Sequence, residues 1–253
     1  MTDEKSIVSD WQIEQLRCTA FLQPQSNVAA HAAFAAIADS EPVVRSENTQ
    51  QGMSSSSGNL DSIKMDVIQL PGRLDVVFQS AEQVPDAPIP PIGAYRQQKD
   101  ALAERCLHWL TERPSLQRLA MGLIVVAQVP DRTAGYRALQ KLLPSVTLDP
   151  EHSTDFNYQI NRPRLVKIAD DFRIKINRLS RWGVTASIFQ TIVVRPGEVA
   201  LMSRPVLVRN VCRIELDLSS DQEVPALPPE HVPSLWQTLS YLADEIISEG
   251  DIP

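Results

Sequence analysis

Residues 63–80 read IKMDVIQLPGRLDVVFQS, in which two runs of alternating apolar and polar residues flank a Pro-Gly pair. Successive side chains of a strand point to opposite faces of its sheet, so this alternation predicts two half-buried strands. Pro71 and Gly72 favour a tight turn between them, because proline presets its own backbone angle and glycine tolerates a left-handed one. The stretch therefore predicts a β-hairpin.

Elements on both sides extend the hairpin into a larger unit. In chain order we expect a strand at 14–22, an Ala-rich helix at 26–39, the hairpin, a helix at about 94–112 and an apolar strand at 119–129. Residues 14–130 then follow the order β-α-β-β-α-β, which resembles the split βαβ topology of ferredoxin-like folds. The expected class is α+β, with an antiparallel sheet whose right-handed crossovers place helices on one face.

The rest of the chain, residues 131–253, predicts a second α+β half that packs closely on the first. A short helix after Asp131 precedes strands at 156–164, 172–181, 183–194 and 205–220, and a C-terminal helix ends near Gly250. The second half would enlarge the antiparallel sheet, and whether the two halves are duplicated stays open. Two segments are expected to lack regular structure, namely a loose N-terminus at 1–13 and a flexible polar loop at 46–59.

The composition is that of an ordinary globular protein. The chain has 253 residues and a formal net charge of −7, which argues against non-specific binding to nucleic acid or anionic lipid by the whole molecule. Its three cysteines are far apart and form no CxxC pair, so we expect buried free thiols in a reducing compartment. The start is not a signal peptide and the longest apolar run is too short to span a bilayer, so we expect a cytoplasmic protein without membrane contact.

A short phrase occurs twice, as FNYQINRPR at 156–164 and FRIKINRLSR at 172–181. In each copy Phe and Ile lie four residues apart and point to the same side of a strand, into the core. An Asn-Arg pair follows, which we expect near a strand end, where side chains can reach solvent or a ligand. If the two strands form a simple hairpin, they carry their Asn-Arg pairs to opposite ends, whereas a crossover or an intervening strand would bring the pairs together, and the sequence leaves both open.

Charge is distributed unevenly along the second half. Residues 162–213 hold eleven Lys and Arg against three Asp and Glu, whereas residues 214–253 hold nine acids and no Lys or Arg. Two explanations are open. Either the two blocks neutralise each other, within the fold or across a self-interface, or the basic block faces an anionic partner.

The second explanation predicts an anion or phosphate site. Guanidinium groups match phosphate geometry, side-chain amides can orient the ligand, and an aromatic ring can stack on a base. The candidate anion-binding residues are Asn161, Arg162, Arg164, Asn177, Arg178, Arg181 and Trp182. The first explanation predicts instead that the arginines lie on a solvated sheet face with the acidic helix packed nearby.

The sequence carries no catalytic signature such as a glycine-rich phosphate loop, HExxH or GxSxG, and we assign no catalytic residue, cofactor or metal ligand. Two weaker patterns remain. Glu104 and His108 lie four apart on the expected helix, where a surface ion pair is a commoner outcome than an acid–base pair. Glu215 and Asp217 share a strand face, as paired carboxylates do in metal-dependent nucleases, although salt bridges to the basic strands explain them equally.

Three hypotheses about function follow from these patterns, in order of preference. The first is a non-enzymatic binding or scaffold protein of a prokaryotic cytoplasmic complex, which contacts a protein partner or self-associates through the basic sheet edge or the acidic C-terminal helix. The second is an RNA- or nucleotide-phosphate-binding module that uses the basic strand ends within residues 162–213. The third is a metal-assisted hydrolase with Glu215 and Asp217 at its site.

Overall fold

The computed structural model describes residues 11–23, 28–81, 90–111, 115–189, 192–193, 201–202, 207–221 and 226–253. The helices are α1 (Ala30–Ala38), α2 (Tyr95–Thr111), α3 (Arg132–Leu142) and α4 (Val232–Glu249). The strands are β1 (Gln12–Leu22), β2 (Val44–Asn48), β3 (Met53–Leu60), β4 (Ile63–Leu70), β5 (Arg73–Ser80), β6 (Gly93–Ala94), β7 (Leu116–Val129), β8 (Asn157–Asn161), β9 (Arg164–Lys167), β10 (Arg173–Phe189), β11 (Ile192–Val193), β12 (Leu201–Met202) and β13 (Leu207–Ser220).

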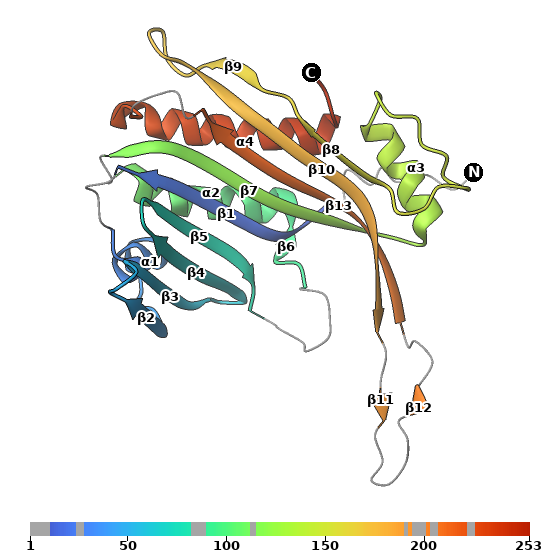
Figure 1. The fold of residues 1–253 in the computed structure, drawn as a ribbon, viewed down its shortest axis with the longest axis horizontal. Helices are drawn as coiled ribbons and strands as arrows, with labels where there is room; N and C mark the ends of the chain where they lie inside the picture. The colour runs from blue at the N-terminus through green and yellow to red at the C-terminus, as the bar shows by residue number, and fades with distance from the viewer. Residues whose placement is uncertain are drawn as a thin grey trace.

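A single large antiparallel sheet organises the fold (Figure 1). Its eleven strands follow the order β2-β3-β4-β5-β1-β7-β13-β10-β8, with β6 paired to β1 and β9 paired to β10. The predicted division at residue 130 falls inside this sheet, because β7 pairs with β1 on one side and with β13 on the other. The protein is thus a mixed helix and strand fold with a large antiparallel sheet and a C-terminal helix.

The hairpin predicted at 63–80 is confirmed. β4 and β5 pair along their whole length, from Ile63 opposite Ser80 to Leu70 opposite Arg73, which leaves only Pro71 and Gly72 in the turn. Gly72 adopts a φ of 71°, the left-handed region that glycine enters without a steric penalty. The apolar face of the hairpin is buried, as its alternation requires.

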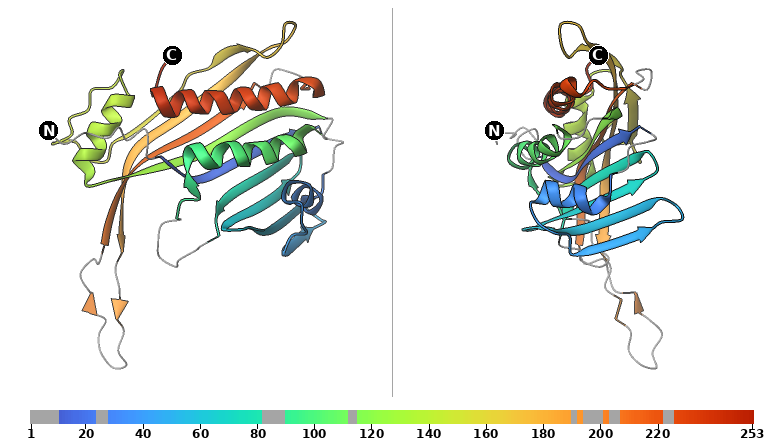
Figure 2. Two further views of the ribbon diagram at one scale, coloured as in Figure 1. Left: turned by 180° about the vertical axis from the view of Figure 1, so that it is seen from behind. Right: turned by 90° about the vertical axis from the view of Figure 1, so that its left-hand side faces the viewer.

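The helices cover one face of the sheet (Figure 2). α1 packs on β3 and β4, α2 on β1, α4 on β7 and β13, and α3 on β10 and β13. The core lies between the two layers and includes Trp11, Trp109, Trp182 and Trp236, none of them more than 2% exposed. The three cysteines are buried free thiols, as expected. Among the described residues, the opposite face of the sheet is not covered by a helix.

The polar loop predicted at 46–59 is wrong. β2 and most of β3 occupy this segment, and they extend the sheet beyond the hairpin. The serine run of β3 contributes hydrogen bonds, because Ser54 Oγ accepts from the backbone N–H of Ala30 at the start of α1 (3.2 Å). Small hydroxyl side chains suit a strand that lies close under a helix, and a hydrophobic pattern does not reveal such a strand.

The strands predicted at 172–181 and 183–194 are one strand through Phe189. β10 passes Gly183 without a break, and its pairing with β13 runs from Ile176 opposite Ser220 to Phe189 opposite Leu207. A Cβ at Gly183 would lie 3.3 Å from the carbonyl oxygen of Phe156, so glycine here permits a close backbone approach instead of ending the strand. Residues 190–191, 194–200 and 203–206 lie outside the described part.

Glycine at position 58 lets α1 approach the sheet. A Cβ built there would lie 2.6 Å from Cζ of Phe34, a buried ring with little room to move. We expect Gly58→Ala to lower the free energy of unfolding by about 1–3 kcal/mol through overpacking.

Chemical denaturation measures this change, with Asn59→Ala on the exposed neighbour as the control. Replacing the ring with a smaller side chain, as in Phe34→Leu, should recover part of the loss in the double variant Gly58→Ala plus Phe34→Leu. The two side chains then no longer compete for the same space. Additive effects of the two substitutions would contradict the proposed contact.

Candidate functional site

Three predicted site residues converge beneath the C-terminal end of α4. Arg162 follows β8, Arg164 begins β9 and Arg178 lies within β10, and all three side chains point toward the helix layer. Arg162 Nε and Nη2 donate to the two carboxylate oxygens of Asp251 at 2.5 and 2.8 Å, a bidentate pair. Guanidinium and carboxylate groups match in this geometry, so each bond is charge-assisted.

Glu245 of α4 forms ion pairs with the other two arginines, Arg164 and Arg178. Arg164 Nη1 lies 2.8 Å from Oε1 and 2.9 Å from Oε2 of Glu245, while Arg178 Nη2 donates to Oε1 at 2.9 Å. Arg164 Nη2 also donates to a backbone oxygen of Pro253 (2.8 Å). A single carboxylate, itself 11% exposed, therefore stands between two guanidinium groups.

Arg178 is the most deeply placed of the three. Its side chain is 2% exposed, and burial is the main cause that lowers the pKa of this guanidinium, with the nearby charge of Arg164 as a second cause. Nε and Nη1 of Arg178 have no hydrogen-bond partner among the described residues. By contrast, the hydrogen bonds from Arg162 to Asp251 are the main cause that raises the pKa of Arg162.

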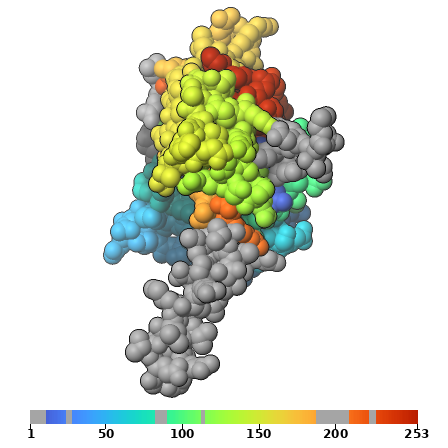
Figure 3. Space-filling view, turned by 90° about the vertical axis from the view of Figure 1, so that its right-hand side faces the viewer, coloured from blue at the N-terminus to red at the C-terminus, as the bar shows by residue number. Residues whose placement is uncertain are grey.

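Asp251 connects the segment that follows α4 to α3 and β8 by hydrogen bonds. Besides Arg162, its carboxylate accepts from Tyr158 Oη (2.8 Å) and Ser145 Oγ (3.3 Å), and its backbone N–H donates to the carbonyl of Leu142 (2.8 Å). Gly250 makes this approach possible, since a Cβ there would lie 2.0 Å from the Leu142 oxygen. Figure 3 shows the end of α4 in red against the yellow-green surface of α3.

The remaining predicted site residues do not join this cluster. Asn161, Asn177 and Arg181 lie on the uncovered face of the sheet, where Asn161 Nδ2 donates to Asn177 Oδ1 (3.2 Å) and Arg181 pairs with Glu215 (2.9 Å). Trp182 is fully buried on the helix side, and its Nε1 donates to Ser180 Oγ (2.9 Å), so it presents no stacking surface. The seven residues thus fall on two faces of one sheet.

The doubled phrase brings its two Asn-Arg pairs side by side, although β8, β9 and β10 are antiparallel neighbours. Asn161 Oδ1 accepts from the backbone N–H of Arg178 (2.9 Å), and the N–H of Arg162 donates to the carbonyl of Arg178 (3.3 Å). The expectation that a simple hairpin separates the pairs is wrong, because β10 continues past Arg178 and the second pair sits in mid-strand.

Basic residues of the second half therefore meet carboxylates from the last forty residues. Arg162 pairs with Asp251 and Arg164 pairs with Glu245. On the other face of the sheet, Arg181 pairs with Glu215, and Lys175 lies 3.5 Å from Asp221. A phosphate would have to compete with these carboxylates for the same guanidinium groups. The phosphate-binding hypothesis stays a prediction, to which this pairing adds no support.

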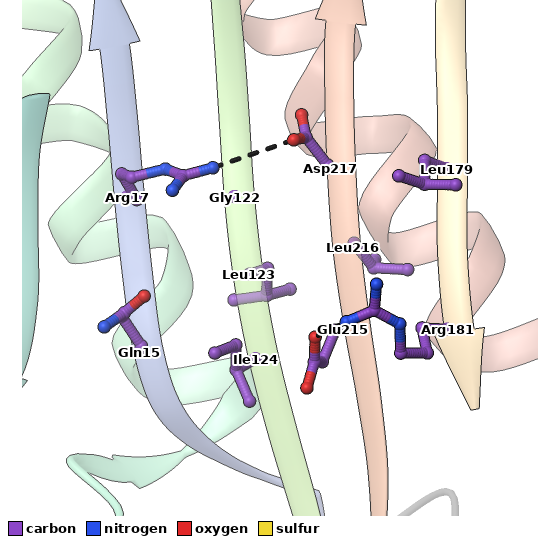
Figure 4. A pocket seen from close by; sticks show the side chains of 10 residues that line it. All are labelled: Gln15, Arg17, Gly122, Leu123, Ile124, Leu179, Arg181, Glu215, Leu216 and Asp217. Carbon is purple, nitrogen blue, oxygen red and sulfur yellow. Dashed lines mark hydrogen bonds and ion pairs between the residues drawn. The ribbon is translucent and has the colours of Figure 1, made fainter. Parts of the chain in front are cut away.

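On the uncovered face, a hollow of about 190 Å³ lies over the centre of the sheet (Figure 4). Gly122 of β7 has no side chain, and the side chain of Arg17 from β1 crosses over it toward Asp217 of β13 (3.7 Å). Glu215 beside it accepts from Arg181 and from Arg213, each at 2.9 Å. Both carboxylates of the metal-hydrolase hypothesis thus lie next to arginines, and the described residues contain no group of three His, Cys, Asp or Glu placed to hold a metal ion.

A second depression lies between α2 and α4 on the outer side of the helix layer, with a volume of about 420 Å³. Ala103, Leu107 and Trp236 form its apolar floor, and Trp236 Nε1 donates to the carbonyl of Ala103 (2.9 Å). Tyr241 stands at its edge and is 65% exposed. We call this depression, lined from α2 and α4, the interhelical groove.

Acidic side chains dominate the rim of the interhelical groove. Asp100, Glu104 and Asp244 contribute three carboxylates, and Lys99 contributes the one cation among the lining residues. Lys99 is buried and lies 2.5 Å from Asp244 and 3.1 Å from Asp100. Asp244 also accepts from Tyr95 Oη (2.7 Å), and burial followed by the charge of Asp244 raises the pKa of Tyr95.

Of the residues that line this groove, the sequence pattern singles out only Glu104, as a partner of His108. The spacing of Asp100 and Glu104 on one helix and Asp244 on the other indicates exposed helix faces, and only the tertiary structure places them together. No protein-family model and no curated protein matches the chain. Within the described part of the chain, none of the helices combines the length and hydrophobicity needed to cross a membrane.

Asp251→Asn tests the buried ion pair. The substitution keeps the shape of the side chain but leaves Arg162 without its counter-ion, and we expect a loss of roughly 3 kcal/mol in unfolding free energy near neutral pH. Hydrogen bonding from Arg162 is the main cause that lowers the pKa of Asp251 in the folded protein. A lowered folded-state pKa stabilises the protein above the unfolded-state pKa, and this stabilisation is lost as pH falls through the folded-state value.

Urea unfolding at a series of pH values therefore should show the wild type losing its advantage over Asp251→Asn below about pH 4. Asp170→Asn, at a fully exposed position paired with Lys167, is the control and should follow the wild-type profile. A gap between wild type and Asp251→Asn that stays constant on acidification would contradict the assignment.

Proposed function

We propose that the protein is a non-enzymatic binding or scaffold protein of a prokaryotic cytoplasmic complex, and that its contact surface is the interhelical groove. The observation that carries the proposal is an apolar floor with an acidic rim and an exposed tyrosine at its edge. Tyrosine is enriched where partners dock, because it offers a large rigid surface together with a hydrogen-bonding hydroxyl.

Charge complementarity selects the partner. Lys99 is neutralised by its neighbours, so the outward field of the rim comes from the carboxylates of Asp100 and Glu104. A basic segment is attracted to such a rim and an acidic one is repelled. The occupant we propose is therefore an amphipathic helix of a partner protein, with Lys or Arg beside its apolar stripe.

The dimensions of the groove fit this occupant. The groove is lined by residues 99–107 of α2 and 236–244 of α4, and an α-helix rises about 1.5 Å per residue, so each lined wall extends roughly 13 Å. About two turns of a partner helix can lie along walls of this length. The buried free cysteines support a reducing compartment for the complex.

A ferredoxin-like description of the first half belongs to the same proposal. The order β7-β1-β5-β4, with α1 and α2 on one face, supports a split βαβ unit to which β2 and β3 add a further hairpin. Such folds host many unrelated functions, so this description supports no particular activity.

Charge reversal in the groove tests the proposed function. The probe is an 18-residue amphipathic helical peptide, long enough to extend beyond both ends of the groove, made of Leu and Lys, with a Leu and Glu peptide of the same pattern for comparison. Calorimetric titration should show that the wild-type protein binds the Leu/Lys peptide and does not bind the Leu/Glu peptide. Asp100→Lys plus Glu104→Lys should weaken binding of the Leu/Lys peptide by about tenfold or more, since two attractive contacts become repulsive.

The matched control is Glu47→Lys plus Glu249→Lys, which changes the net charge equally at exposed positions outside the groove. It should bind the Leu/Lys peptide nearly as well as the wild type. Equal weakening in both double variants would mean that only net charge attracts the peptide, and binding of neither peptide to the wild type would remove the proposal.

A further inference from the structure

A small cavity lies beside the buried arginine of β10. It has a volume of about 10 Å³, and its lining includes Arg162, Arg178, Ser180, Ile246, Asp251 and Ile252. A volume of this order holds about one water-sized occupant, which leaves no room for a phosphate group. The cavity is separate from the interhelical groove and shares none of its lining residues.

Hydrogen-bond donors outnumber acceptors around this cavity. Arg178 Nε and Nη1 are buried and have no partner in the described structure, and its side chain is 2% exposed. Ser180 Oγ already accepts from Trp182 Nε1, so its own proton is left to donate. The carboxylate of Asp251 already accepts hydrogen bonds from Arg162, Tyr158 and Ser145.

Arg178 also shares its counter-ion with a second arginine. Arg162, Arg164 and Arg178 bring three guanidinium groups together, and Glu245 and Asp251 bring two carboxylates. Arg164 also donates to a backbone oxygen of Pro253, whereas the bond from Arg178 to Glu245 goes to a carboxylate that it shares with Arg164. Buried charged donors are costly when they lack partners, so the surroundings favour an occupant that accepts hydrogen bonds and carries negative charge.

From donors, charge and size together, we propose that this cavity is a binding site for a single halide ion, chloride under physiological conditions. The ion lies against Arg178 Nε and Nη1 with Ser180 Oγ as a further donor. It supplies the acceptor that Arg178 Nε and Nη1 lack and so stabilises the attachment of the C-terminal end of α4 to β10.

Thermal unfolding in matched salts tests the site. At equal ionic strength, Tm should rise with chloride or bromide relative to gluconate, which is too large for the cavity, and the rise should saturate at about 3 °C or more. Arg178→Met should abolish this difference. Arg181→Met is the control and should retain it, because Arg181 lies on the opposite face of the same strand.

Equal Tm values of the wild type in chloride and gluconate would overturn the proposal, and so would a halide effect that survives Arg178→Met. If Arg178→Met does not fold, crystals of the wild-type protein grown in sodium bromide decide the question. An anomalous bromide peak within hydrogen-bond distance of Arg178 Nε or Nη1 supports the site. A water molecule there, without an anomalous signal, contradicts it.

Discussion

The buried ion pairs beneath α4 constrain much of the second half of the fold. Taking guanidinium and carboxylate groups out of water is costly, and the cost is offset only where the partners meet in good geometry. Arg162, just after β8, meets this condition with two bonds to Asp251, just after α4. Arg178 in β10 adds one bond to Glu245 in α4. The pairs therefore fix the position of α4 along β8 and β10 more narrowly than apolar contacts alone would.

This pairing explains the uneven charge of the sequence. Several arginines of the basic block pair with carboxylates of the acidic block inside the molecule, so the arginines that suggest an anion site already have carboxylates beside them. Arg178 is paired with Glu245 through Nη2, but its Nε and Nη1 have no partner among the described residues. The anion site that we propose is therefore limited to the small cavity beside Arg178. The proposed partner contact lies elsewhere, in the interhelical groove.

Coverage of the sheet by helices on one side gives the protein two different exterior surfaces. The outer side of the helix layer has the interhelical groove, whose apolar floor and acidic rim suit a basic partner segment. The uncovered sheet face instead carries cross-strand ion pairs, such as Arg17 with Asp217 above Gly122. The groove and the buried cavity share no lining residues, so failure of either proposal leaves the other standing.

Local pattern by itself determined most of the elements. Alternation predicted β1, β4 and β5, helical periodicity predicted α2, and Pro71-Gly72 set the turn, because these features depend on residues only a few positions apart. The same reasoning failed at β3 and at Gly183, where polar or small residues occupy strands for reasons of close packing.

Only the tertiary structure decided which charges meet. Arg178 and Glu245 are 67 residues apart, and Arg162 and Asp251 are 89 apart, so no local pattern can pair them. Strand register decided that Arg162 and Arg178 share a cluster while Arg181 faces the other way, because a shift of one residue reverses the face of every side chain. The sequence supplied the charges, and the fold decided which of them were buried, paired or left facing solvent.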